Sequence, residues 1–227
     1  MSQSELVYEL MKEHADRMDL SGFHPASDEY RRKMNRTYEI FSEAFKMSAE
    51  DKYPGVYAEC LYDERGICEF VLTADGMTDA YKSTVALFKA KPDTFPYPVT
   101  LFRQGNGDSS LEAKIIDRNG KQVNVKEWDQ LGITISRALD GLLRCTFFYE
   151  GSSAYRFIAI NAPSILTNII GEYSMMMILD GVAIEPMPKE DNEKIEIKML
   201  SEIKEAFEYI CWKQGMDPYP SPHLTTH

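Results

Sequence analysis

The sequence predicts an α+β protein with a mainly antiparallel sheet, built from hairpins and packed by amphipathic helices. Two observations carry this prediction. Segments with apolar residues at helical spacing alternate with pairs of short β-rich runs, and turn-forming residues join the paired runs. The 227 residues are 44% hydrophobic and 11% aromatic, which is enough apolar content to bury a core. We therefore expect one domain over residues 1–215 and a mobile tail over residues 216–227.

A helical pair is expected at the start of the chain, over residues 1–48, on or beside the sheet. Ser2 and Glu5 form a capping-box pattern that predicts a helix over residues 4–18. Gly22 and Pro25 end it, and Ser27 caps a second helix that runs to about residue 47. The apolar face of this second helix consists of Tyr30, Met34, Tyr38, Phe41 and Phe45.

A first hairpin is predicted over residues 56–74 around a turn at residues 63–66. This turn pairs Tyr62 with Ile67 and Leu61 with Cys68, so that Cys60 and Cys68 point to opposite faces. The better apolar face then contains Tyr57, Leu61, Cys68, Phe70 and Leu72. A helix over residues 78–89 and a strand over residues 99–102 follow.

The second half of the chain is predicted to contain two more hairpins and three more helices. Residues 111–117 and 121–125 flank a three-residue turn, and residues 144–149 and 154–161 flank residues 150–153. A helix is predicted between these two hairpins, because apolar residues recur there at steps of three and four: Trp128, Leu131, Ile135, Leu139 and Leu142. Pro163 begins an apolar helix to residue 179, an extended piece covers residues 182–187, and a long last helix covers residues 189–213.

Charge and composition exclude several classes of partner. The formal net charge is −11 and the pI is about 4.9, which opposes binding to a phosphate backbone, so no nucleic acid is expected. The apolar stretch over residues 165–184 is interrupted by Asn168, Glu172 and Asp180, so we expect no membrane span. The N-terminus lacks the apolar core of a secretory signal, and a cytoplasmic protein follows.

Cysteine and histidine spacing predicts neither a disulfide framework nor a metal site. The four cysteines form no C-x-x-C pair, which indicates reduced thiols, and the four histidines show no ligand spacing. Gly105 and Gly107 lack the lysine and helix start of a phosphate loop, and no G-x-S-x-G elbow is present. Cys145 fits a strand-buried structural thiol. We expect no cofactor, and binding rather than catalysis.

Two groups of residues are candidate sites. Tyr149, Glu150, Tyr155 and Arg156 lie on the third predicted hairpin, and Glu172 lies on the apolar helix that follows. An arginine and a carboxylate in such surroundings either line a polar pocket or form a buried ion pair.

The second group is a basic cluster in an otherwise acidic chain: Arg31, Arg32, Lys33 and Arg36. It fits either an acidic partner or a solvated face with ion pairs to Glu29 and Glu39.

The sequence therefore predicts a noncatalytic, acidic, cytoplasmic binding protein that acts through protein–protein contacts, of the regulator, immunity or accessory type. Its amphipathic helices also offer seams for a homodimer. The alternative is a small-ligand sensor or an enzyme with a polar pocket around Glu150, Arg156 and Glu172.

Overall fold

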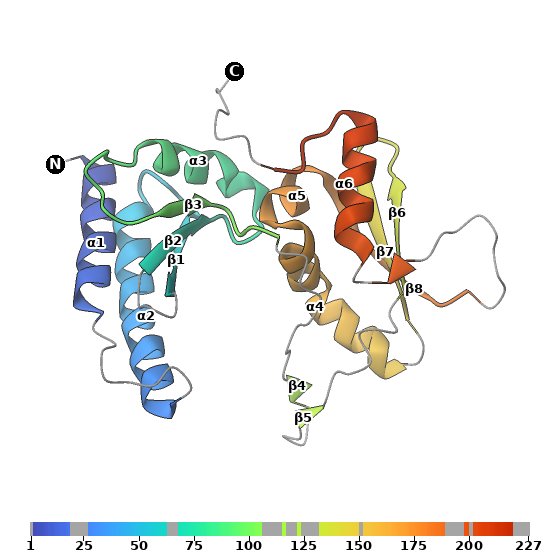
Figure 1. Cartoon of the computed structure of the whole chain (residues 1–227), viewed down its shortest axis with the longest axis horizontal. Coiled ribbons are helices and arrows are strands. Elements are labelled where there is room, and N and C mark those ends of the chain that lie inside the picture. Colours follow the sequence, from blue (N-terminus) through green and yellow to red (C-terminus); the bar gives the residue numbers. More distant parts are fainter. Residues whose placement is uncertain are drawn as a thin grey trace. The chain divides into compact units, whose positions relative to one another are not determined.

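The computed structural model describes residues 2–18, 27–62, 68–105, 115–116, 122–123, 132–149, 152–188, 198–199 and 202–219. The chain falls into two units, Met1–Arg103 and Gln104–His227, and each is described by itself. Both contain helices and a small mixed sheet (Figure 1), which confirms the α+β class. The predicted single domain over residues 1–215 stays a prediction.

The two N-terminal helices form as the sequence predicts. Helix α1 (Gln3–Arg17) begins with the capping box, in which the Ser2 hydroxyl accepts from the Glu5 backbone N–H and the Glu5 carboxylate accepts from the Ser2 N–H. Helix α2 (Asp28–Ala49) begins at the Ser27 cap. Figure 1 shows the two helices side by side, and their buried faces share one apolar cluster with the sheet.

The first hairpin forms, but the predicted register is wrong by one residue. Strand β1 (Tyr57–Tyr62) pairs antiparallel with β2 (Cys68–Thr73), and the register opposes Tyr62 to Cys68 and Cys60 to Phe70. The face toward α1 and α2 therefore carries Cys60 and Cys68 together. A one-residue shift moves every side chain of a strand to the other face.

Packing against the helices explains the register. The observed pairing places the small Ala58, which is 2% exposed, in the same apolar cluster as Phe41 and Phe45 of α2. The register predicted from the turn would have placed Leu61 there instead, and Leu61 is 51% exposed in the structure. Burial of the aromatic rings thus decides the register over local turn chemistry.

The sheet of the first unit is completed by a parallel strand. A 3₁₀ turn (Thr78–Ala80) and α3 (Tyr81–Lys89) connect β2 to β3 (Val99–Leu101), and the sheet order is β1-β2-β3 with β2 and β3 parallel. The sequence predicts these elements, but not their parallel pairing. A helical crossover is the connection that parallel neighbours require.

The second unit contains a four-stranded mixed sheet of order β8-β7-β6-β9. Strand β6 (Gly132–Arg137) pairs antiparallel with β7 (Leu143–Tyr149), so the helix predicted from residue 128 to about residues 140–141 is wrong where the structure describes it. The segment is β-rich because Ile133, Thr134 and Ile135 are β-branched, and their spacing matches a helix only by coincidence.

The second strand of the third predicted hairpin is instead part of helix α4 (Ser152–Ile170). Its core face contains Ala162, Ile165, Leu166 and Ile169, all at most 1% exposed. Pro163 lies inside this helix rather than at its start. Its missing N–H leaves the Ala159 carbonyl without a helical partner, at a point where the helix is exposed to solvent.

Gly171 ends α4 with a φ of +87°, which only glycine adopts without strain, and α5 (Glu172–Met177) follows. Strand β8 (Leu179–Pro186) then pairs parallel with β7. The long last helix is shorter than predicted, because β9 (Lys198–Met199) pairs with β6 and α6 spans only Ile203–Gln214. Its buried face contains Ile203, Phe207 and Cys211.

Two smaller features complete the second unit. Strands β4 (Ile115–Ile116) and β5 (Gln122–Val123) pair in the register predicted for the second hairpin, with Ile115 opposite Val123. At the predicted tail, the Ser174 hydroxyl donates to the Pro218 carbonyl at 2.7 Å, so residue 218 is anchored to α5. Residues 220–227 lie outside the described part of the chain.

Candidate functional site

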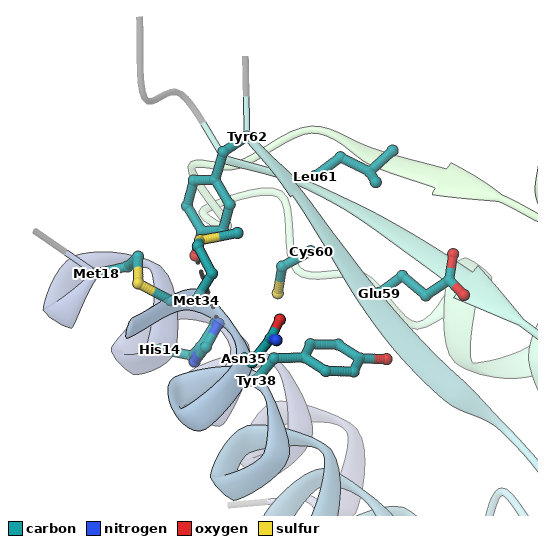
Figure 2. Close-up of a pocket in the computed structure, with 9 residues that line it drawn as sticks. All are labelled: His14, Met18, Met34, Asn35, Tyr38, Glu59, Cys60, Leu61 and Tyr62. Carbon is teal, nitrogen blue, oxygen red and sulfur yellow. Dashed lines mark hydrogen bonds between the residues drawn. The ribbon is translucent and has the colours of Figure 1, made fainter. Parts of the chain in front are cut away.

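A pocket of about 310 Å³ lies in the first unit, where α1 and α2 meet strand β1. Figure 2 shows its side chains converging from these three elements. Those lining it are His14, Met18, Met34, Asn35, Tyr38, Glu59, Cys60, Leu61 and Tyr62. An apolar pocket with a few converging polar groups is the usual form of a small-molecule site.

His14 contributes a neutral imidazole to this pocket. Helix α1 holds it 7% exposed, and its ring stacks on Phe41 of α2 with centroids 4.2 Å apart. Burial lowers the pKa of His14 to about 4, because a charged imidazolium would lose its hydration there. One ring nitrogen, Nε2, lies 3.4 Å from the Tyr62 hydroxyl. At neutral pH the ring can therefore accept or donate one hydrogen bond without carrying charge.

Strand β1 contributes a thiol and a phenol to the pocket, Cys60 and Tyr62, and helix α2 contributes a second phenol, Tyr38. Cys60 is half-buried on β1, and Figure 2 shows its sulfur directed toward Asn35 and Tyr38 of α2. Burial raises the pKa of both Tyr38 and Tyr62, so each hydroxyl keeps its proton at neutral pH. The converging groups are thus uncharged donors and acceptors.

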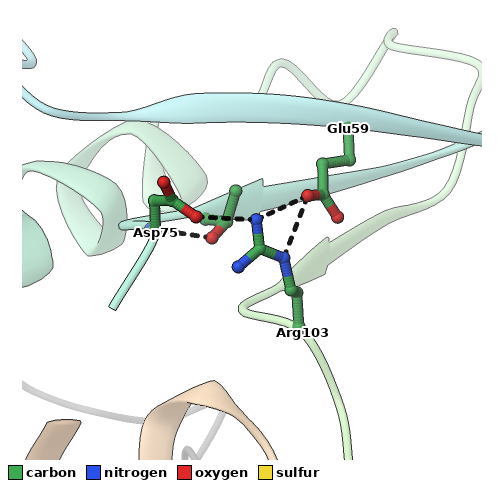
Figure 3. A network of polar contacts seen from close by, with 4 residues as sticks. Glu59, Asp75 and Arg103 are labelled. Atoms are coloured by element: carbon green, nitrogen blue, oxygen red, sulfur yellow. Dashed lines mark hydrogen bonds and ion pairs between the residues drawn. The ribbon is translucent and has the colours of Figure 1, made fainter. Parts of the chain in front are cut away.

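The one carboxylate at the pocket, Glu59, is already paired. Arg103 donates to Glu59 Oε1 through Nε at 2.9 Å and Nη2 at 2.6 Å, and Nη2 also lies 3.0 Å from Asp75 (Figure 3). Both partners of the Glu59–Arg103 pair are about 30% exposed, with values of 28% and 32%. The charge of Glu59 is therefore compensated from within the protein.

The backbone at Asp75 supports this network. Asp75 has a φ of +50° and its N–H donates to the Thr73 hydroxyl at 2.9 Å. A positive φ is uncommon outside glycine but is tolerated by aspartate in a turn. Phe102, which precedes Arg103, has a φ of +61° and is fully buried. These two positions fix where the guanidinium and the second carboxylate meet.

The predicted polar site around the third hairpin rests on a different local structure. Tyr155 and Arg156 lie on α4 rather than on a strand, and Tyr149 ends β7, with the two tyrosine rings 5.2 Å apart. Glu172 begins α5 and is 1% exposed. Glu150 and the side chain of Arg156 lie outside the described part, so this site stays a prediction.

The basic cluster predicted from the sequence lies on the first half of α2. Arg31, Arg32 and Arg36 are exposed and Lys33 is half-buried. They lie on the same helix that supplies Met34, Asn35 and Tyr38 to the pocket. Whether they meet an acidic partner stays a prediction.

The second unit also contains a pocket, of about 300 Å³, but of different character. It is lined by Arg137, Ala138, Leu139, Asp140, Arg144 and Asp180. Arg144 and Asp180 form an ion pair at 2.6 Å, with the arginine side chain 52% exposed. This is a solvated polar depression between strand ends, without the buried aromatic and sulfur groups of the first pocket.

Within the described residues, no three His, Cys, Asp or Glu side chains gather as a metal site would require. No helix among them is long and apolar enough to cross a membrane. Comparison of the chain with protein-family models, with curated proteins and with solved structures finds no match in any of the three. The pocket geometry is therefore the main guide to function.

Sequence reasoning missed the pocket for a specific reason. The histidines were predicted only to lack ligand spacing, and the predicted hairpin register placed Cys60 and Tyr62 on the face away from the helices. A usable signal was present in β1: the small Ala58 and Cys60 alternate with the polar Glu59, which indicates the packed face.

Proposed function

We propose that the protein is a noncatalytic binding protein that takes a small, uncharged ligand in the pocket between α1, α2 and β1. One observation carries the proposal: neutral polar groups of His14, Tyr38 and Tyr62 converge with thioethers and aromatic rings in one pocket of about 310 Å³. Such a lining favours a ligand with an aromatic or aliphatic body and one or two hydrogen-bonding groups.

A matched pair of variants on one helix tests this proposal. Met34→Trp fills the pocket, whereas Met47→Trp places the same ring on α2 at a position 77% exposed. The probes are indole and benzimidazole, detected by ligand-observed NMR with the full chain. Binding to the wild type and to Met47→Trp, with loss in Met34→Trp, supports the proposal. Equal binding to all three proteins, or none to the wild type, contradicts it.

Action through protein contacts is a second candidate, and a separate observation favours it. On α6, Tyr209 and Trp212 are 52% and 74% exposed, and their rings lie 6.2 Å apart. Exposed aromatic pairs are typical of interface anchors. With a net charge of −11, the partner we propose is a protein with a basic surface. We also propose a cytoplasmic location. A second copy of the chain is the alternative partner for this surface, which would make the protein a homodimer.

Sedimentation and a salt series separate these occupants. If the surface binds a different, basic protein, the wild type is expected to bind it, Trp212→Ala is expected to lose that binding, and added salt is expected to weaken it. Concentration-dependent dimerisation that Trp212→Ala abolishes would instead assign the surface to a second copy. Tyr209→Ala is the second variant, because Tyr209 is the other ring of the same exposed pair on α6. Trp128, the only other tryptophan in the sequence, lies outside the described part and cannot serve as a control.

A further inference from the structure

The outward face of α6 carries aromatic rings where a solvated helix usually carries only polar side chains. Positions at steps of three and four share one face of a helix, and on this face they are Glu205, Glu208, Tyr209 and Trp212. The buried stripe of α6 lies on the opposite side, at Ile203, Phe207 and Cys211. Two large rings therefore stand beside two carboxylates on the face turned to solvent.

Tyr219 adds a third ring and holds one of these carboxylates. It follows α6 after the turn at Gly215, its side chain is 45% exposed, and its hydroxyl donates to Glu208 Oε1. This hydrogen bond raises the pKa of Tyr219 to about 12, so the hydroxyl keeps its proton and remains a donor at neutral pH. The second oxygen, Oε2, has no hydrogen bond to the described residues, so it can accept from a further donor.

A contact within the chain shows which kind of group these rings bind. The Lys213 ammonium nitrogen lies 4.5 Å from the centroid of the Tyr209 ring, which is a cation–π contact. Tryptophan is the stronger cation-binding ring, and Trp212 is 74% exposed with no cation over it in the described part of the chain. Glu208 precedes Trp212 by four residues, so the two side chains are neighbours on the helix surface. A second cation therefore has a place over Trp212, beside a carboxylate.

We infer that the α6 surface, consisting of Glu208, Tyr209, Trp212 and Tyr219, binds an arginine side chain of a partner protein. The inference rests on the second candidate function proposed above, and it names the group that the partner supplies.

The geometry of the surface favours arginine over lysine. A planar guanidinium can stack on the Trp212 ring and at the same time donate to Glu208 Oε2 from its edge. A lysine ammonium is a compact, strongly hydrated charge without a flat face, so it gains less from the ring. The net charge of −11 attracts any basic segment and does not distinguish the two. The preference for arginine therefore depends on this surface alone.

The test compares two peptides of equal charge by NMR of the full-length chain. The probes are seven-residue peptides in which three arginines or three lysines alternate with glycines. The chain has two tryptophans, so two indole N–H signals are expected, and Trp212→Ala identifies the one that belongs to Trp212. We expect the arginine peptide to shift this signal and to bind about fivefold more tightly than the lysine peptide.

Two variants of equal net charge separate the local carboxylate from the overall charge. Glu208→Gln keeps an oxygen for the Tyr219 hydroxyl but has no charge beside Trp212, so it is expected to bind both peptides with similar, lower affinity. Glu185→Gln removes a charge at an exposed position of β8 and is expected to keep the preference for arginine. Equal affinity of the wild type for both peptides, or a loss of preference in Glu185→Gln as large as in Glu208→Gln, would overturn the inference.

A second copy of the chain is the competing occupant of the α6 surface. A dimer that depends on Trp212 and persists in the presence of the arginine peptide would assign the surface to that copy, and the inference would be wrong. Failure of the inference is distinguishable from failure of the proposed surface. If a protein partner requires Trp212 but the two peptides bind equally well, the surface stands and only the assignment to arginine falls.

Discussion

The two units of the chain share one order of elements and use it differently. In each, an antiparallel hairpin is followed by a helical crossover and a strand parallel to the second hairpin strand: β1-β2-α3-β3 and β6-β7-α4-α5-β8. In the first unit Cys60 lines a pocket beside His14, whereas in the second unit Cys145 and Cys211 are enclosed in an apolar core. The same topology therefore supports either a site or a core, depending on what covers the sheet.

The covering helices explain this difference. In the second unit, α4 and α6 bring isoleucine, leucine and phenylalanine onto the sheet and fill it. In the first unit, α1 and α2 bring His14, Asn35 and Tyr38 to the end of β1. These hydrogen-bonding groups line an open pocket there, where the second unit has a closed apolar core.

The largest expected effect concerns the aromatic cluster that supports the pocket. Phe70 is fully buried and lies about 6 Å from the rings of Phe41, Phe95 and Tyr97, at 6.0, 6.0 and 6.1 Å. We expect Phe70→Ala to lower the free energy of unfolding of the first unit by about 3–5 kcal/mol. Residue-resolved hydrogen exchange measures this as lost protection in β1–β3, with indole binding lost as well.

The matched substitution in the other unit is Phe147→Ala, also at a fully buried position. It is expected to cost the β6–β8 sheet a similar amount. If Phe147→Ala abolished indole binding while Phe70→Ala preserved it, the assignment of the pocket to the first unit would be wrong.

A pH dependence confined to the first unit is the next largest effect. The pKa of His14 is about 4 in the folded protein and about 6.5 in an unfolded chain, so the unfolded state binds more protons between these values. Stability is therefore lost as the pH falls from about 6.5 to about 4, by about 3 kcal/mol, and changes no further below that from this group.

Denaturant unfolding at a series of pH values measures this dependence. His14→Gln keeps a polar partner for Tyr62 but cannot titrate, so its stability should be flatter across the same window. An equally steep loss in His14→Gln would show that another group causes it.

Ion pairs allow a smaller comparison between the units. Arg103 makes three contacts to two carboxylates, whereas Arg144 contacts one carboxylate, Asp180, among the described residues and is more exposed. We expect Arg103→Met to destabilise the first unit by about 1–2 kcal/mol and Arg144→Met to destabilise the second by less than about 1 kcal/mol. Thermal unfolding at low and high salt measures both, and a larger effect for Arg144→Met would reverse the comparison.

The sequence predicted the elements of the first unit better than those of the second, for a physical reason. Helices α1 and α2 carry their own caps, at Ser2 and Ser27, so local chemistry determines where they start. Strand β6 and helix α4 have no comparable signal. Ile133 and Ile135 fit a helical spacing, and the tyrosine and isoleucine residues of α4 suit a strand equally well.

The candidate site depends on information that local patterns lack. Its histidine, asparagine and cysteine come from three elements, and only the hairpin register brings them together. That register is determined by burial of Phe41 and Phe45 against the sheet, a contact between residues distant in the chain. A turn-based prediction cannot include this contact.

The comparison of the two units is tested most directly by the alkylation rates of the four cysteines in the native chain. Iodoacetamide at pH 8, followed by peptide mass spectrometry, gives a rate for each thiol. We predict that Cys60 reacts first, because it is half-buried and lines the pocket, and that Cys145 and Cys211 react at least about 100-fold more slowly, because both are fully buried in the core of the second unit. Equal rates at all four thiols, or faster reaction at Cys145 and Cys211, would contradict the account.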